Sequence, residues 1–184
     1  MKQARLVTIK YNKLVEKFKV VELDDWNKVA DALVRLIEPG FIVALSGPLG
    51  AGKTTLTQYL ATLLGAPKRA ISPTFALMRI YNVPRTTYHV RRRGSKSDIR
   101  NSAKRTFSEA MHRMVHGEAD IRRLVHVDAY RIEDEKDLVV LDLDEELSEQ
   151  GTVVLIEWPE NAKSWLKKYA KQTVQVKIKL ETGN

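Results

Sequence analysis

The chain of 184 residues contains no cysteine, which excludes disulfide bonds and thiolate metal sites. It also contains no run of about 20 apolar residues, the length that a membrane-spanning helix needs. The first residues, MKQARLVTIKYNKLVEKFKV, include neither an uninterrupted apolar core nor the small-residue cleavage site of a signal peptide. Together, these absences lead us to expect a cytoplasmic protein with no membrane association.

The composition is that of a globular domain, with 43% hydrophobic and 29% charged residues. The net charge of +8 is concentrated in residues 84–122, which hold ten Lys or Arg and four Asp or Glu. This segment also contains a predicted helix over about 102–115. Three interpretations of the segment stay open: a decoration packed on the domain, a surface that binds tRNA phosphates, or a docking site for an acidic protein.

Apolar and alternating runs predict strands that are interleaved with helices along the chain. The predicted strands are 18–23, 41–45, 75–81, 124–130, 153–158 and 174–180, and the predicted helices near the N-terminus are 25–37 and 54–64. This alternation favours an α/β layer fold with at least part of its sheet parallel. We therefore expect one domain over residues 1–184, with residues 84–122 as a basic helical insertion between two strands.

A glycine-rich motif directly follows the predicted strand 41–45. Residues 47–54 match G-x-x-x-x-G-K-[ST], between a strand and a helix as the P-loop requires. Glycines leave room for a triphosphate to lie against backbone N–H groups, and the helix N-terminus adds a positive dipole. Lys53 can then bridge the terminal phosphates, and the Thr54 hydroxyl can bind Mg²⁺. The glycines that give this clearance are Gly47, Gly50 and Gly52.

Two acids stand where a P-loop protein needs a second contact to the metal and a group that orients the nucleophile. Glu157 ends the apolar strand VVLIE, and Asp128 lies in HVDAYR. The carboxyl edge of a parallel sheet faces the ligand crevice, although exposed salt bridges would explain either acid equally well. Trp158 fits a core position or a place beside the ligand.

The segment SPTF at residues 72–75 lies between the P-loop helix and the next strand. A hydroxyl in such a loop can sense the γ-phosphate, and Thr74 is the candidate here. A simple Ser-Pro turn that starts a strand explains the same residues.

Five motifs follow one another along the chain: LGAGKTT at 49–55, SPTFALMRIY at 72–81, HVDAYRI at 126–132, DLVVLDLDEEL at 137–147 and VVLIEWPE at 153–160. In this order they resemble the TsaE (YjeE) family, the P-loop ATPases of bacterial tRNA threonylcarbamoyladenosine synthesis. The resemblance covers about residues 18–83 and 124–180. It implies a three-layer P-loop NTPase domain with a mostly parallel or mixed central sheet.

The same resemblance implies a protein that binds ATP with Mg²⁺ and hydrolyses it slowly on its own. It also implies association with the TsaD and TsaB proteins, which attach the threonylcarbamoyl group to adenosine in tRNA. ATP hydrolysis would reset or license that complex without performing the transfer. A small-molecule P-loop kinase is the alternative function, although LIEWPE and SPTFALMRIY do not belong to kinase patterns.

The family also implies roles for single residues. Thr54 and Glu157 would hold Mg²⁺, and Asp128 would be a second acid near the metal or the attacking water. Thr74 would belong to the nucleotide-sensing loop, and Trp158 would be the tryptophan beside the site. The residues that would bind phosphate are Gly50, Ala51, Gly52, Lys53, Thr54 and Thr55.

Four features depart from the family pattern. Pro48 replaces the usual Asp of the P-loop, and Asp142 stands where the family has Gly. Aspartate tolerates a left-handed backbone better than most residues, so the turn at this position can survive. The chain also reaches Asn184 without the late arginine-bearing hairpin of the family, and residues 84–122 replace a short turn.

Overall fold

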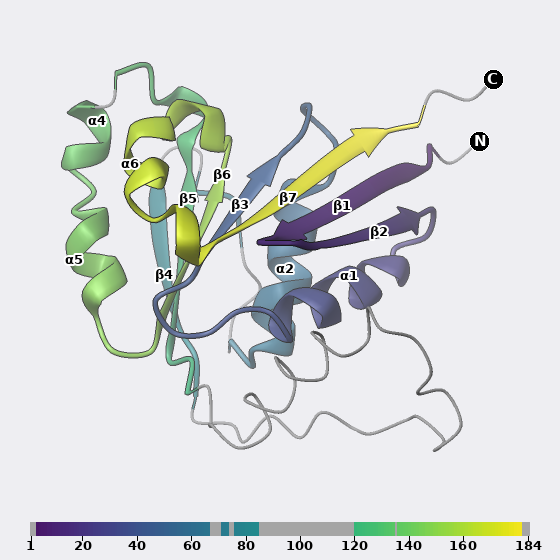
Figure 1. The fold of residues 1–184 in the computed structure, drawn as a ribbon, viewed down its shortest axis with the longest axis horizontal. Coiled ribbons are helices and arrows are strands. Elements are labelled where there is room, and N and C mark those ends of the chain that lie inside the picture. The colour runs from purple at the N-terminus through teal and green to yellow at the C-terminus, as the bar shows by residue number, and fades with distance from the viewer. Residues whose placement is uncertain (1–2, 67–70, 74–75, 85–119, 135, 182–184) are drawn as a thin grey trace.

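Seven strands form one mixed sheet in the order β2-β1-β7-β3-β6-β5-β4 (Figure 1). The structure is a computed structural model, and it describes residues 3–66, 71–73, 76–84, 120–134 and 136–181. The strands are β1 (Arg5–Tyr11), β2 (Leu14–Val20), β3 (Ile42–Ser46), β4 (Met78–Asn82), β5 (Arg123–Asp128), β6 (Thr152–Glu157) and β7 (Thr173–Leu180). The helices are α1 (Asp25–Val34), α2 (Lys53–Leu63), α4 (Lys136–Val139), α5 (Leu143–Ser148) and α6 (Lys163–Lys168), with short 3-10 turns at η1 (Ala129–Arg131), η2 (Pro159–Asn161) and η3 (Ala170–Gln172).

The centre of the sheet is parallel. Strands β7, β3, β6 and β5 pair in parallel, whereas β1 and β2 at one side and β4 at the other pair antiparallel. All six residues of β6 are buried, as expected for a parallel strand that is covered on both faces. Because β3, β5 and β6 run in one direction, their carboxyl ends meet at one edge of the sheet.

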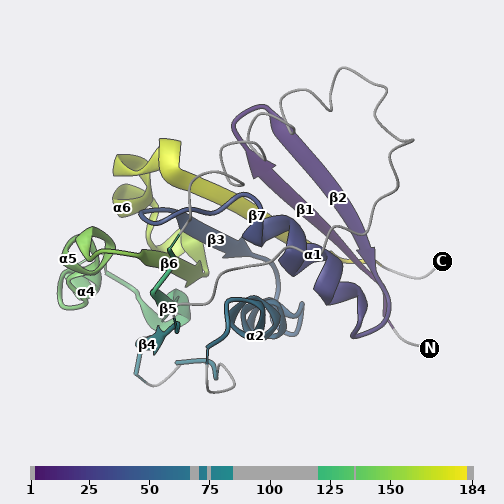
Figure 2. The same ribbon diagram turned by 90° about the horizontal axis from the view of Figure 1, so that it is seen from below.

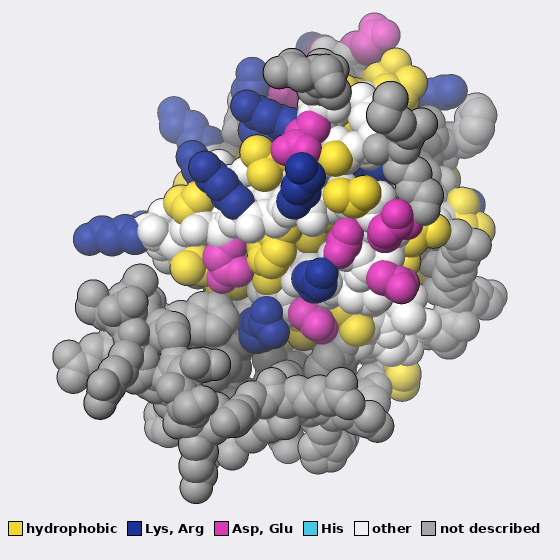
Figure 3. Space-filling view, turned by 90° about the vertical axis from the view of Figure 1, so that its right-hand side faces the viewer, with side chains coloured by type: hydrophobic (Ala, Val, Ile, Leu, Met, Phe, Trp, Pro, Cys, Tyr) yellow, Lys and Arg dark blue, Asp and Glu magenta, His cyan; other side chains and the backbone are white. Residues whose placement is uncertain are grey.

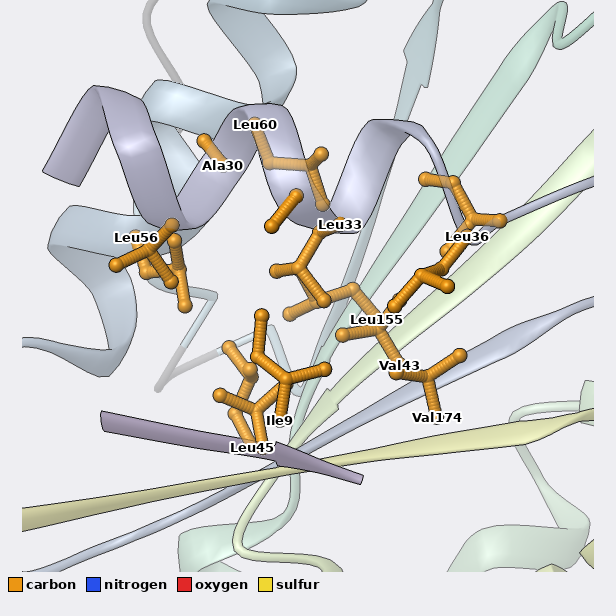
Figure 4. Packing of buried hydrophobic residues seen from close by; sticks show 14 of the residues in the cluster. Ile9, Ala30, Leu33, Leu36, Val43, Leu45, Leu56, Leu60, Leu155 and Val174 are labelled. Atoms are coloured by element: carbon orange, nitrogen blue, oxygen red, sulfur yellow. The ribbon is translucent and has the colours of Figure 1, made fainter. Parts of the chain in front are cut away.

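Helices cover both faces of the parallel strands (Figure 2). On one face, α1 and α2 pack against the sheet through a large apolar cluster that includes Leu33, Leu56 and Leu155 (Figure 4). On the other face, a second cluster joins the sheet to α4, α5 and α6 and includes Ile156 and Trp165. The expected single α/β domain with a mixed sheet is therefore confirmed.

The N-terminal residues form a β-hairpin, which the sequence analysis missed. Strands β1 and β2 pair from Arg5–Val20 to Tyr11–Leu14, so only two residues connect them. Asn12, the first of these, has φ 53°, the left-handed conformation that tight hairpin turns use. The signals for the hairpin were the alternation of RLVTIKY and LVEKFKV and an Asn at the turn, but only the end of the second strand was recognised.

Smaller differences occur elsewhere in the chain. The structure adds the short helices α4, α5 and α6, which the sequence analysis did not predict. Asp142 has φ 45°, so an aspartate does occupy a left-handed position there. The predicted helix over 102–115 and most of the proposed insertion lie outside the described residues. No described helix combines the length and hydropathy needed to cross a bilayer.

Candidate functional site

The loop between β3 and α2 lies at the carboxyl edge of the parallel strands, and its glycines cannot be replaced without strain. A Cβ on Gly47 would lie 2.6 Å from the carbonyl oxygen of Ile178, and one on Gly52 would lie 2.5 Å from the Trp26 ring. Gly50 has φ +73° and no neighbour within 4 Å of a Cβ, so its backbone faces open space. The loop thus rests on packed neighbours on its inner side and leaves its backbone open toward the cleft.

Arg5 supports this loop from strand β1. Its Nε donates to the carbonyl oxygen of the fully buried Ala51 at 3.0 Å. Arg5 precedes the loop by 46 residues, and no local motif links the two. No role for Arg5 could therefore be predicted from the sequence.

Lys53 is buried within the loop that it follows. Its Nζ donates to the carbonyl oxygens of Gly47 at 2.9 Å and Pro48 at 3.0 Å. Only 5% of the residue is exposed. Burial lowers the pKa of the ammonium group, and three nearby carboxylates act in the opposite direction. An ammonium group that is held by two neutral carbonyls can transfer its hydrogen bonds to anionic phosphate oxygens, which are stronger acceptors.

Thr54, Glu157 and His126 form a hydrogen-bonded chain that joins α2, β6 and β5. The Thr54 hydroxyl donates to the Glu157 carboxylate at 3.1 and 3.3 Å, and His126 Nε2 lies 2.9 Å from Glu157 Oε1. Glu157 is 2% exposed and His126 is fully buried. A carboxylate only accepts, so Nε2 carries the proton, and Nδ1 has no partner among the described residues. The sequence analysis quoted His126 within a motif but assigned it no role.

Asp128 lies beside Glu157, since the two residues are register partners in neighbouring parallel strands. Its carboxylate accepts from the Ser72 hydroxyl at 2.8 Å and from the Tyr130 backbone N–H at 3.2 Å. Both carboxylate oxygens are therefore oriented by the chain. Ser72 belongs to the segment in which Thr74 was the candidate, but Thr74 itself lies outside the described residues.

Trp158 forms one wall of the site in a strained backbone conformation. Its φ of 59° and ψ of 53° are left-handed, which costs a non-glycine residue about 1–2 kcal/mol. The indole ring stacks obliquely on Tyr130, with centroids 4.9 Å apart, and Lys53 Nζ lies 3.8 Å from the ring centroid. Such strain is found most often at functional sites.

These groups surround a cleft of about 360 Å³. Eight of the residues expected at the site line it, whereas Gly47 and Ala51 lie in the loop beneath. Tyr130 and Ser72 are lining residues that the sequence analysis did not assign to the site. The expected residues along the cleft are Gly50, Gly52, Lys53, Thr54, Thr55, Asp128, Glu157 and Trp158.

Two oxygen groups of the cleft, the Thr54 hydroxyl and the Glu157 carboxylate, are of the type that Mg²⁺ prefers. The described residues contain no group of three or more His, Asp or Glu that could hold a metal by themselves. A donor set of this kind suits a Mg²⁺ ion whose remaining ligands are phosphate and water. The open backbone at Gly50 and the N-terminus of α2 also suit a phosphate chain.

Comparison with known proteins gives a consistent result. A sequence model described as "Threonylcarbamoyl adenosine biosynthesis protein TsaE" matches residues 20–92 and 105–184. A Bacillus subtilis protein named "tRNA threonylcarbamoyladenosine biosynthesis protein TsaE" is 30% identical over 142 residues, covering 77% of this chain and 65% of the relative. A protein of the same name from Streptomyces coelicolor is 34% identical over 128 residues, covering 70% of this chain and 63% of the relative.

The matched part of the chain thus spans slightly less than two thirds of the length of these two relatives. Among solved structures, Bacillus subtilis YdiB superposes with a TM-score of 0.53 at 20% identity. That superposition covers 100% of this chain and 82% of the other. It supports the fold.

Proposed function

Because the chain belongs to the TsaE family, we propose that it is a cytoplasmic, Mg²⁺-dependent ATPase that assists the tRNA threonylcarbamoyladenosine modification complex. One observation carries the proposal. The P-loop lysine and the Thr54 hydroxyl at the start of α2 meet the Glu157 carboxylate, which comes from the distant strand β6, in one cleft at the carboxyl edge of the sheet.

ATP and Mg²⁺ fit the chemistry of this cleft. A bound Mg²⁺ supplies charge neutralisation for the phosphates. Thr54 and Glu157 are placed to bind the metal, and Lys53 is placed to exchange its loop carbonyls for phosphate oxygens. His126 holds the Glu157 carboxylate in orientation through the 2.9 Å contact, as second-layer partners of metal ligands commonly do.

Asp128 takes the role of the second acid in this proposal. With one carboxylate oxygen held by Ser72 and the other by the Tyr130 N–H, it can accept a hydrogen bond from a water molecule and orient it toward the terminal phosphate. A water positioned in this way is the nucleophile that hydrolysis needs. Trp158 and Tyr130, whose rings contact each other, form the wall of the cleft beside this place.

The proposed partners are the TsaD and TsaB proteins, and the proposed role of hydrolysis is to reset or license their complex. A reconstituted reaction tests this directly. Threonylcarbamoylation of tRNA by TsaB and TsaD is measured with and without this chain, with Lys53→Ala as the inactive variant and Lys28→Ala as a matched surface control. We expect multiple turnovers only with the wild type and the control. Equal product in all four reactions would contradict the proposal.

The alternative, a small-molecule kinase, gives a different result in a simpler assay. ATP turnover is measured after addition of nucleosides and sugars, and separately after addition of TsaB with TsaD. The proposed function requires stimulation by the proteins only. Stimulation by a small acceptor, with a phosphorylated product, would identify a kinase.

A further inference from the structure

The outer face of the antiparallel part of the sheet carries five lysines. Strands alternate their side chains between two faces, and in β1, β2 and β7 one set packs on α1 and α2 while the other is exposed. None of the exposed positions in this outer set is occupied by Asp or Glu. We call this surface the lysine face, and it consists of Lys10, Lys17, Lys19, Lys177 and Lys179.

The strand register sets the spacing of these charges. Leu6 lies between Lys19 and Lys179, and Thr8 lies between Lys17 and Lys177. Two rows of lysines therefore run along β2 and β7, about 10 Å apart across β1, with about 7 Å between neighbours in a row. The result is an array of lysines whose attachment points are spaced by the strand register.

Ion pairing is sparse on this face. Lys19 lies 3.2 Å from Glu181, but within the described part of the chain no ion pair involves Lys10, Lys17, Lys177 or Lys179. Elsewhere several exposed lysines do have acidic partners, such as those that pair with Asp25, Asp134 and Asp144. In Figure 3, Lys and Arg side chains project along the upper left border, while Asp and Glu lie mainly over the centre and right of that view, together with further Lys and Arg.

Protection of an exposed strand edge explains only part of this pattern. Lysines on an edge strand prevent pairing with other chains, which accounts for Lys17 and Lys19 on β2. Strand β7, in contrast, is paired on both sides, with β1 and β3. The pairing with β3 ends at Lys177, so Lys177 protects no edge and needs another explanation, whereas Lys179 lies beyond the end of β3.

Strand β7, which carries two of these lysines, lies beside the start of the P-loop. Lys177 is the register partner of Ser46, the last residue before the P-loop, and Gly47 of that loop packs against Ile178. Ile178 points to the opposite face of β7 from Lys177 and Lys179, so strand β7 itself would separate a ligand on the lysine face from the loop that we propose binds ATP.

We propose that the lysine face binds the phosphate backbone of a folded RNA. Lysine is depleted in the cores of protein interfaces, and a membrane-binding surface needs apolar side chains to insert. The outer positions of these strands include no aromatic residue, so the face offers no platform for stacking bases. Its apolar side chains, Leu6 and Val15, lie apart from each other among the lysines. The face mainly offers point charges, which suit phosphate contacts without sequence reading.

The test compares two triple variants of the full chain. In one, Lys17, Lys177 and Lys179 are changed to Gln; in the control, Lys28, Lys136 and Lys168 are changed to Gln, giving the same loss of charge. The control lysines are exposed on α1, α4 and α6. Binding of fluorescently labelled, unmodified tRNA is measured by anisotropy between 50 and 200 mM KCl, a range over which phosphate contacts lose much of their strength.

Each lost phosphate contact lowers the slope of log affinity against log salt by about 1. We expect the face variant to lose about 3 in slope and to bind between roughly tenfold and a thousandfold more weakly at 100 mM salt. The control variant should stay close to the wild type. Thermal melting of both variants shows whether they are folded.

Equal affinity and slope in the two triple variants would overturn the proposal. So would face-dependent binding of polyglutamate, or of vesicles containing phosphatidylglycerol, without face-dependent binding of tRNA. The inference rests on the proposed function only in the choice of tRNA as probe. ATP binding, measured on the same samples, distinguishes failure of the proposed ATPase function from failure of the proposed RNA surface. A wild-type chain that binds no ATP but binds tRNA through the lysine face would refute the ATPase and support the RNA surface.

Discussion

The substitution Gly52→Ala probes how the P-loop is built into the fold. The new Cβ would lie 2.5 Å from the Trp26 ring, at a backbone φ of +102°. Trp26 is only 2% exposed, so its ring cannot move aside into solvent. The left-handed backbone costs an alanine about 1–3 kcal/mol, and the overpacking adds about 1–3 kcal/mol. We expect a total loss in the free energy of unfolding of about 2–6 kcal/mol, the sum of these two ranges.

Gly40→Ala is the matched control. Gly40 has φ +85° but nothing within 4 Å of a Cβ, so this variant experiences the backbone strain alone, about 1–3 kcal/mol. Urea unfolding of both variants measures the difference. Adding Trp26→Phe, which shortens the side chain and removes the outer indole atoms that the new Cβ would meet, should recover about 1 kcal/mol or more of the Gly52→Ala loss as a coupling energy. Equal destabilisation by the two glycine variants, together with additivity of Trp26→Phe, would refute the packing argument.

Three further predictions follow from other contacts. His126→Leu removes the donor to the Glu157 carboxylate and should raise the Mg²⁺ concentration for half-maximal ATP hydrolysis by about 10- to 100-fold. His126→Gln keeps an N–H donor, so its half-maximal Mg²⁺ concentration should lie near that of the wild type. Identical half-maximal concentrations for the two variants would contradict an orienting role. Thr54→Val keeps the shape of the side chain but removes its hydroxyl, so ATP binding measured by equilibrium dialysis should no longer respond to Mg²⁺. Asp144→Ala removes the acceptor of the Tyr169 hydroxyl at 2.8 Å and should lower the free energy of unfolding by about 1 kcal/mol at neutral pH. Hydrogen bonding, first from Tyr169, lowers the pKa of Asp144 in the folded state. The stabilisation is therefore present above the unfolded pKa of Asp144 and is lost as the pH falls through its folded pKa. The free energies of unfolding of wild type and variant, measured in urea, should converge in acid.

The phosphate loop was predictable because its signal is local. Strand, glycines, lysine and helix follow one another within 47–54 and its flanks, so no long-range information was needed. The position of Glu157 was predictable for a related reason: it ends an apolar strand, and parallel strands bring such ends to one edge. Asp128 was expected inside a longer strand over 124–130, whereas β5 ends at Asp128. The family comparison confirms the resemblance on which the remaining interpretation depended.

The supporting contacts could not be predicted in the same way. His126 reaches Glu157 only because β5 and β6 pair in one particular register, 31 residues apart, and Arg5 reaches the P-loop from a hairpin that was not recognised as a whole. Ser72 holds Asp128 across 56 residues. In each case the residue type is ordinary, and tertiary pairing alone gives it a role. The proposals for Thr74 and for the insertion remain predictions, because both fall outside the described residues.

The central claim is that Mg²⁺ and ATP bind together where Glu157 meets the P-loop. Isothermal titration of ATP into the folded chain, with and without Mg²⁺, tests it most directly, using the wild type and Glu157→Gln. We predict that ATP binds to the wild type with measurable heat and that Mg²⁺ raises the affinity. In Glu157→Gln, the ATP affinity should no longer respond to Mg²⁺. Absence of heat with the folded wild type, or an unchanged Mg²⁺ response in Glu157→Gln, would contradict the account.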